Sequence, residues 1–559
     1  MVTRPPGRGG LAGGMRQLQS AIGNAAMGRL AATRGRRALA RFGEPEHKAI
    51  GDKALPDVRW RLRKAGTVID NPFTDFQLTF GDWVALGDWF EDVNEVREML
   101  RPGKQGEDRI GQLYYTLFVK IRPKTQKEAD AAQRLGGKEG GLWTEEDQKA
   151  VDMRYQVLKT RNIKHFPNPL VGDTKLSMAE KAKRTKDGKP FGAIAQYHHD
   201  HLEAIGVAIA AAHKPDERFL GDALAQDGFA CHFLTDAFSG SHARTPRASI
   251  EEYWDKKVPK FDERLVNWLA DEATFVVINH PNTEIRKKGF SNWFEGEQEL
   301  GAGMAPRTAR AAIRKKIRPE VPELSFGDIV GLVVHDWEGS HGPLVDVAGQ
   351  RFRLAGDDAM LPAVTGMQNV NTDKELTAAL KDRKRSGAEK TFAGASLAVR
   401  ASVNDIRRAF ELAKKDTNKS RIIGKLTDKD GLFASERLLP SIVPDSRQPE
   451  EDRMPKWDYA TVDQLLSDPK ICAALPMSAD RVGGPFNDTL KTLDASQAVK
   501  DHLRKVVVNP LTSRSVPRIV AWLKGVIDYS EARLFKRLRP LPGPVERDLN
   551  DLRQSAGAR

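Results

Sequence analysis

The chain has 559 residues, 40% of them hydrophobic and 30% charged, which is typical of a globular protein of about two to four domains. It contains no run of about 18 apolar residues, so no membrane span is expected, and its two cysteines exclude a disulfide scaffold. The net charge is +13, but eight of these charges are arginines in residues 1–43, which hold no acidic residue. The rest of the chain, at 13 − 8 = +5, does not show the strongly basic balance of a whole nucleic-acid-binding domain.

Residues 1–43 form a basic leader rich in glycine, alanine and arginine, without the apolar core of a classical signal peptide. We expect this leader to be disordered, with a transient helix in "RQLQSAIGNAAMGRLAA". The run resembles an "LQ…GN.A..RL" element near the N-terminus of toxins and other proteins linked to bacterial extracellular contractile injection systems. This resemblance covers residues 15–32. It implies that the protein is made in the bacterial cytoplasm, loaded into a contractile injection particle and delivered to a target cell.

Helical patterns dominate the remaining chain, so the sequence predicts a mainly α fold. Long runs with few helix breakers include "HHDHLEAIGVAIAAAH", "RFLGDALAQDGFACHFLTDAF" and "AGASLAVRASVNDIRRAFELAKK". One β signal stands out at 344–354, "LVDVAGQRFRL", where alternating residues flank Ala348-Gly349 as in a hairpin. Residues 436–456 are polar and proline-rich, which is typical of a linker before the last helical segment.

The strongest chemical signal is "HFLTDAFSGSH" at 232–242. His232 and Asp236 are four residues apart in a predicted helix and therefore share one face. Small residues precede them on that face, which leaves room for another helix or an ion. The Ser-Gly-Ser turn lets the chain leave the helix, so that His242 can return toward the pair. Imidazole and carboxylate groups suit zinc and similar ions, although a helix pair with an unrelated loop histidine is the alternative.

This H-x3-D-x5-H spacing within "ACHFLTDAFSGSHARTPR" resembles the zinc-dependent phospholipase C superfamily, which includes the fungal-type single-strand zinc nucleases. Supporting stretches follow in the expected order: "EPEHKAIGDKAL", "FGDWVALGDWFED", "NIKHFPNPL" and "YHHDH". The similarity covers roughly residues 42–250. It implies a multi-helix core that binds one to three zinc ions or other divalent metals, and further ligands at His47, Asp88, His165 and His201. Asp82 competes with Asp88 for its place, and His198 shares a helix face with His201.

The sequence departs from the family in two places. The superfamily uses an N-terminal tryptophan amine as a ligand, but the corresponding region near Phe42 lies inside this chain and has no tryptophan. The family also has a later His-x3-Asp/Glu pair. His280 and Glu284 have that spacing, but Pro281 disfavours a regular helix there. His335 and His341 are further options without the matching spacing.

The resemblance predicts a metal-dependent phosphodiester hydrolase that acts on phospholipid or nucleic acid. Asp88 would also orient the attacking water, and Arg244 and Arg247 would grip a phosphate oxygen, with surface charge as their alternative role. The competing hypothesis is a non-catalytic, metal-stabilised cargo or structural protein of the injection system. The expected segments are a leader at 1–43, a metal-binding helical domain at 44–345, a hairpin and helical extension at 346–435, a linker at 436–456 and a helical segment at 457–559.

Overall fold

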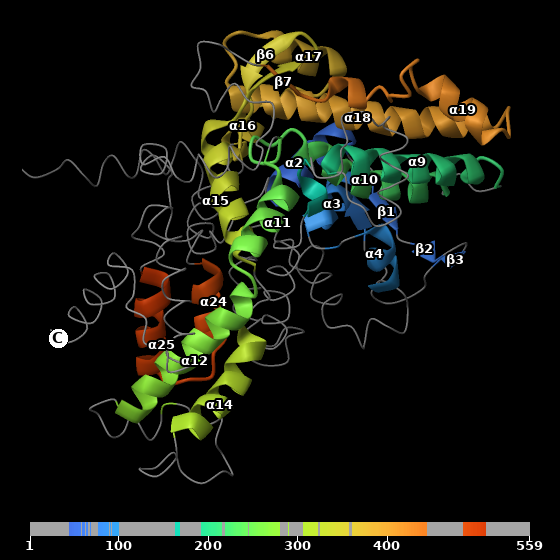
Figure 1. The fold of residues 1–559 in the computed structure, drawn as a ribbon. Coiled ribbons are helices and arrows are strands. Elements are labelled where there is room, and N and C mark those ends of the chain that lie inside the picture. Colours follow the sequence, from blue (N-terminus) through green and yellow to red (C-terminus); the bar gives the residue numbers. More distant parts are fainter. Residues whose placement is uncertain are drawn as a thin grey trace, which may run out of the picture.

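The computed structural model describes residues 44–56, 59–61, 63–64, 67–68, 77–88, 90, 92–99, 163–167, 192–214, 219–243, 245–279, 289, 306–321, 325–356, 360–443 and 484–509. This part of the chain is mainly helical (Figure 1), which confirms the predicted class. None of its helices is long and apolar enough to cross a bilayer. The leader at 1–43 and most of the C-terminal segment at 457–559 lie outside the described residues.

The first hydrophobic cluster is built around one central helix, α10 (Phe219–Asp236), in which every residue from Ala223 to Asp236 is buried. A helix that is buried on all sides must be covered by neighbours all round. These neighbours are α9 (Ala193–Ala211), α18 (Gly387–Ala413), α3 (Phe80–Ala85) and α2 (Glu44–Ala54). Buried side chains of 345–433 therefore share one core with those of 50–238.

Small residues on α10 let a neighbouring helix come close. A Cβ added to Gly228 would lie 2.7 Å from the Cβ of Trp83 on α3, which is too short for two carbon atoms in ordinary contact. The sequence predicted that small residues on this face leave room for another helix, and α3 occupies that room. The short 3-10 helix η1 (Leu86–Asp88) follows α3, and α4 (Val93–Met99) comes after it.

The predicted hairpin is confirmed. Strands β5 (Leu344–Val347) and β6 (Gln350–Arg353) pair antiparallel, with Val347 opposite Gln350. The two turn residues, Ala348 and Gly349, both have positive φ, as the common two-residue hairpin turn requires. A third strand, β7 (Ser441–Ile442), joins β5 on its other edge. Two small ladders that were not predicted pair β1 (Arg59–Arg61) with β4 (Gln77–Thr79) and β2 (Arg63–Lys64) with β3 (Thr67–Val68).

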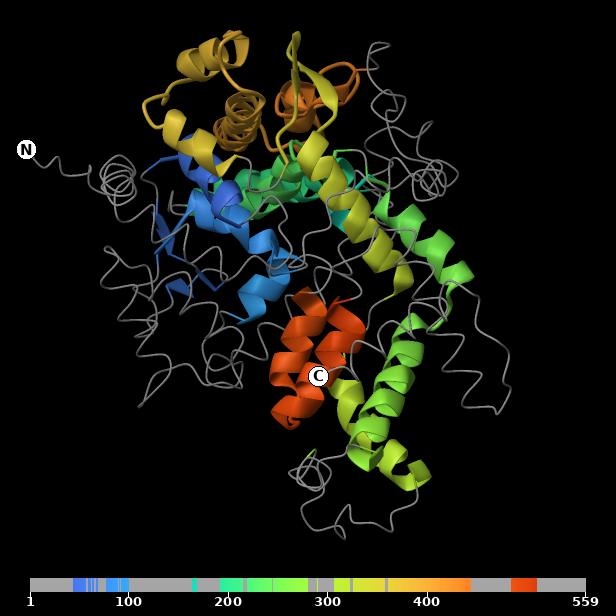
Figure 2. The same ribbon diagram turned by 90° about the vertical axis from the view of Figure 1, so that its left-hand side faces the viewer.

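A second hydrophobic cluster lies below the first in Figures 1 and 2. It is formed by α11 (Arg247–Lys257), α12 (Phe261–Asn279), α14 (Pro306–Ile317), α15 (Phe326–His341), α24 (Gly484–Thr492), α25 (Gln497–Leu503) and the π-helical turn η9 (Arg504–Val508). A short 3-10 turn, η7 (Arg318–Glu320), ends α14.

The rest of the first cluster comes from short helices that cover α18. These are α16 (Leu361–Gly366), α17 (Asp373–Lys381), α19 (Lys419–Leu426) and the 3-10 turn η8 (Glu436–Leu438). Capping boxes fix where several helices begin: Thr79 and Asp82 start α3, Ser325 starts α15, and Ser386 starts α18.

We predict that Gly228→Ala destabilises the protein, because the new methyl group must displace α3 or the Trp83 side chain. Overpacking of a core costs about 1–3 kcal/mol. The matched control is Gly424→Ala in α19, where an added Cβ meets nothing within 4 Å and helix propensity alone favours alanine. Thermal unfolding should give a lower Tm for the Gly228 variant and an unchanged or slightly higher Tm for the control. Equal Tm values for the two variants would contradict the close packing of α10 on α3.

Candidate metal centre

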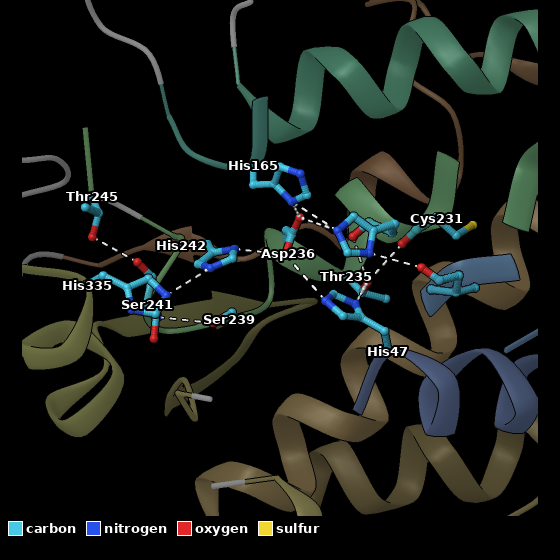
Figure 3. Close-up of polar contacts among 12 residues, drawn as sticks. His47, His165, Cys231, Thr235, Asp236, Ser239, Ser241, His242, Thr245 and His335 are labelled. Carbon is cyan, nitrogen blue, oxygen red and sulfur yellow. Dashed lines mark hydrogen bonds and ion pairs between the residues drawn. The ribbon is translucent and has the colours of Figure 1, made fainter. Parts of the chain in front are cut away.

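The carboxylate of Asp236 lies at the centre of four buried imidazole rings (Figure 3). Its Oδ2 is 2.6 Å from His165 Nδ1 and 3.3 Å from His232 Nε2. Its Oδ1 is 2.8 Å from His242 Nδ1 and 3.6 Å from His47 Nε2. None of the five residues is more than 6% exposed. The fold thus brings together five of the seven residues that were predicted as ligands.

These side chains come from four separate segments. His232 and Asp236 lie in the last turns of α10, one above the other, as their spacing predicted. His47 lies near the start of α2, and His165 ends the 3-10 helix η3 (Ile163–His165). His242 follows the turn after α10, so the site depends on contacts across almost 200 residues of sequence.

The turn that returns His242 is held by backbone hydrogen bonds. The Gly240 N–H donates to the carbonyl of Ala355, which follows the hairpin, at 2.8 Å. The His242 N–H donates to the carbonyl of Ser239 at 3.1 Å. The predicted Ser-Gly-Ser break is therefore a turn held by backbone hydrogen bonds, and it places His242 against Asp236.

Hydrogen bonds at the opposite ring nitrogens fix the tautomers of two histidines. The Thr235 hydroxyl donates to the carbonyl of His232 at 2.8 Å, so its oxygen accepts from His47 Nδ1 at 2.6 Å. His232 Nδ1 donates to the Val84 carbonyl at 3.0 Å, because a carbonyl oxygen can only accept. Both rings consequently turn Nε2 toward Asp236. Histidines that bind metals are held in this way through the other ring nitrogen.

This arrangement fits a divalent cation. One atom each of His47, His232 and Asp236 lie within 4.8 Å of one another, and all three residues are buried. A buried carboxylate is costly unless it is paired with positive charge, which a divalent cation would supply. Nitrogen and oxygen ligands of this kind suit zinc. The residues therefore could hold a metal ion, whose identity as zinc stays a prediction.

A fifth histidine extends the cluster on the far side of His242. His335 of α15 places its Nε2 3.1 Å from His242 Nε2, and Phe166 packs against His242 with ring centroids 4.4 Å apart. Glu338, one turn further along α15, is fully buried. From the sequence, His335 was only a further option as a metal ligand and was not among the predicted ligands. Its signal was the His-x2-Glu spacing, which puts both side chains on one face of a helix.

The two competing aspartates have different surroundings. Asp82 completes the capping box of α3 and forms an ion pair with Lys48 Nζ at 2.7 Å. Asp88 is 3% exposed and ends η1, next to Gly87. A Cβ on Gly87 would come 2.3 Å from Cγ of His232, so η1 lies directly on that ring. Asp82 is thus used as a helix cap, and Asp88 is the aspartate whose segment lies against the cluster.

His201 belongs to a second buried polar cluster between α9, α10 and α18. Its Nδ1 lies 2.6 Å from Asp227 Oδ1, and the Ser402 hydroxyl donates to the same carboxylate at 2.8 Å. Tyr197 lies 2.8 Å from Ser402, and a separate pair joins His198 Nδ1 to Glu436 at 2.6 Å. The structure therefore pairs His198 and His201 of "YHHDH" with carboxylates of their own, apart from the group around Asp236.

Arg247 is engaged by protein groups, and Arg244 lies outside the described residues. The Arg247 Nε lies 3.1 Å from Glu251, its NH2 group 3.5 Å from Asp328, and its guanidinium 5.4 Å from the ring centroid of Phe166. The side chain thus ties α11 to α15 beside the histidine cluster. His280 and Glu284 also lie outside the described residues, as does the side chain of His341.

Comparisons of the chain with protein-family models, curated proteins and solved structures found no match.

We predict that the double variant His232→Ala/Asp236→Ala loses a bound divalent ion that the wild-type protein carries. Metal binding adds to the free energy of folding, so a chelator should lower the wild-type Tm and leave the variant unaffected. His213→Ala, an exposed histidine just after α9, is the control and should keep the metal. Elemental analysis of the purified proteins measures the ion directly. The same metal content in wild type and double variant would exclude this site.

We predict a different result for His201→Gln. Burial alone lowers the pKa of His201, but the surrounding carboxylates, Asp227 first and then Asp405 and Glu436, together raise the pKa above 6.5. The pair therefore stabilises the fold fully below pH 6.5, and this contribution is lost as pH rises through the raised pKa. The variant should lose more unfolding free energy at acidic than at alkaline pH, as denaturant titrations would show, and should keep its metal. A pH-independent loss accompanied by loss of metal would instead make His201 a ligand.

Proposed function

We propose that the protein is a metal-dependent phosphodiester hydrolase of the phospholipase C or single-strand nuclease type. The observation that supports this most is the carboxylate of Asp236 between four histidines from four segments. Each carboxylate oxygen faces a different pair of rings, so one residue can serve two neighbouring ions. His242, His335 and the buried Glu338 supply further ligand groups beside them.

Divalent ions in such a centre supply a water of lowered pKa and neutralise charge on a phosphodiester. Side chains and backbone groups of the protein itself orient the proposed metal ligands. Thr235 and the Val84 carbonyl keep His47 and His232 in the tautomers that present Nε2 to the centre. Asp88 is the carboxylate proposed to orient the attacking water, since its segment lies against His232. Arg247 would have to leave Glu251 and Asp328 before it could grip a phosphate.

The second candidate is a metal-stabilised protein without catalysis, either cargo or a structural part of a contractile injection particle. Its specific support is burial: among the described residues, the ligand group is almost closed to solvent. Structural metal sites are closed, whereas catalytic sites keep an open position. The leader, through which loading into the particle was predicted, lies outside the described residues.

Turnover separates the two candidates. The metal-loaded protein should hydrolyse phospholipid, single-stranded DNA, RNA or a small aryl phosphodiester, and a chelator should stop the reaction. His242→Ala should lower turnover by about 10–100-fold or more, because loss of even a partner that orients a metal ligand typically costs 10–100-fold in metal affinity or activity. It should change Tm far less, and His213→Ala should change neither quantity. Metal-loaded wild type without turnover on any of the four substrates would favour the non-catalytic candidate.

A further inference from the structure

One end of the helices that form the first hydrophobic cluster carries a dense basic surface, which we call the basic tip. It comprises the exposed bases of the last turns of α18, of α19 and of the link between them: Arg407, Arg408, Lys414, Lys415, Lys419, Arg421 and Lys425. Two acidic residues, Glu411 and Asp416, lie in the same stretch outside the core. The seven positive charges therefore outnumber the negative charges of this stretch. The net charge of the whole chain does not reveal this local excess.

The basic tip is one surface rather than a run of sequence. α19 packs back on α18, and α18 packs on α9, so their ends gather at the right of Figure 1. Lys419 lies over α9, where its Nζ would be 2.9 Å from a Cβ added to Gly206. Lys214 follows the end of α9, and its Nζ lies 4.2 Å from the ring centroid of Phe219, where α10 begins.

Several basic side chains elsewhere in the described part of the chain are paired with acids. Arg310 of α14 lies 2.5 Å from Asp271, and Arg318 of η7 lies 2.7 Å from Asp262 of α12. At the basic tip, carboxylates lie near four of the seven bases: Asp416 is 3.3 Å from Arg421 and 3.7 Å from Lys425, Glu411 is 2.8 Å from Lys414, and Asp405 is 3.9 Å from Arg408. Three carboxylates thus face four of the bases, and the tip as a whole keeps a surplus of positive charge toward an outside anion.

The surface chemistry of the tip fits a phosphate backbone better than a bilayer. The large hydrophobic side chains that are exposed in the described residues, Ile194 and Phe275, belong to α9's first turn and to α12, away from the tip. Between the bases the tip exposes polar groups, Asn404, Thr417 and Ser420. Guanidinium, ammonium, hydroxyl and amide groups are the usual partners of phosphate oxygens, and no apolar wedge is present there to enter lipid.

The tip is connected to the metal centre by α10. This helix begins at Phe219, next to the end of α9, and reaches Asp236 after seventeen residues, or about 26 Å at 1.5 Å per residue. A small substrate cannot span that distance, but a polymer can contact both ends.

We propose that the basic tip binds the phosphate backbone of single-stranded nucleic acid. If the protein is a phosphodiesterase, as proposed above, its substrate class is then nucleic acid rather than phospholipid, and in this respect the inference rests on the proposed function. Binding at the tip itself requires no catalysis. Binding through phosphates releases counterions, so affinity should fall steeply with salt.

The test compares two full-length variants with equal loss of charge. The tip variant is Lys415→Gln/Lys419→Gln/Arg421→Gln/Lys425→Gln. The control, Lys374→Gln/Lys381→Gln/Arg383→Gln/Lys384→Gln, removes four exposed bases in and just after α17 at the other end of α18. Fluorescence anisotropy with labelled oligodeoxythymidylate gives the affinity at several salt concentrations. Hydrolysis of a small aryl phosphodiester is measured on the same samples.

The tip variant should bind the oligonucleotide at least 10-fold more weakly, and its salt slope should fall by about 3, since each phosphate contact on a single strand contributes about 0.7. The control variant should keep most of the wild-type affinity. Equal weakening in both variants, or wild-type binding by the tip variant, would overturn the proposal. So would tip-dependent binding to vesicles with anionic lipid but none to the oligonucleotide.

The small-substrate assay keeps the two proposals separate. Unchanged hydrolysis by the tip variant, with weakened oligonucleotide binding, supports both of them. Lack of hydrolysis in every sample would refute the phosphodiesterase, while the binding result would still decide the role of the tip.

Discussion

The charge of one buried carboxylate constrains this structure more than any other feature. Asp236 is fully buried within hydrogen-bonding or ion-pair distance of four imidazoles. Thr235 and the Val84 carbonyl bond to Nδ1 of two of these rings, so that both rings present Nε2 to the carboxylate. Burial of an unbalanced carboxylate costs several kcal/mol, whereas a divalent ion would balance it and bind the facing nitrogens at once. A divalent ion between these side chains would fit the packing, and its presence stays a prediction.

The central helix α10 connects this buried carboxylate to the rest of the fold. Its C-terminal end presents His232 and Asp236, and its middle presents Asp227 to His201 and Ser402. Each buried polar group is met by a different neighbour: α2 and η3 at the end, α9 and α18 in the middle. The close contact of Gly87 with the ring of His232, and of Gly228 with Trp83, shows why glycines stand at these positions. The same helix sets the separation between the metal centre and the basic tip.

Local patterns made the helical class, the hairpin turn at Ala348-Gly349 and the shared face of His232 and Asp236 predictable from the sequence. The resemblance supplied the order of His47 and His165, which periodicity alone would not have singled out, and the structure places both beside Asp236. Contacts between distant segments were harder to predict. Nothing local indicates that Asp227 pairs with His201, and His335 reaches His242 only because α15 packs back across the site. The basic tip was not predicted, because composition averages the charge over the whole chain. Only the packing of α18, α19 and α9 places these bases on one surface.

The central claim is that a metal ion lies between His47, His232 and Asp236. X-ray absorption spectroscopy on the purified, full-length protein tests it most directly, because the spectrum reports both the element and its ligands. The account predicts a bound divalent ion, zinc in the first instance, with imidazole nitrogen and carboxylate oxygen at about 2.0–2.2 Å, and loss of the imidazole signal in His47→Ala/His232→Ala. A metal-free protein of unchanged stability, or an ion whose ligands are unaffected by that double variant, would contradict it.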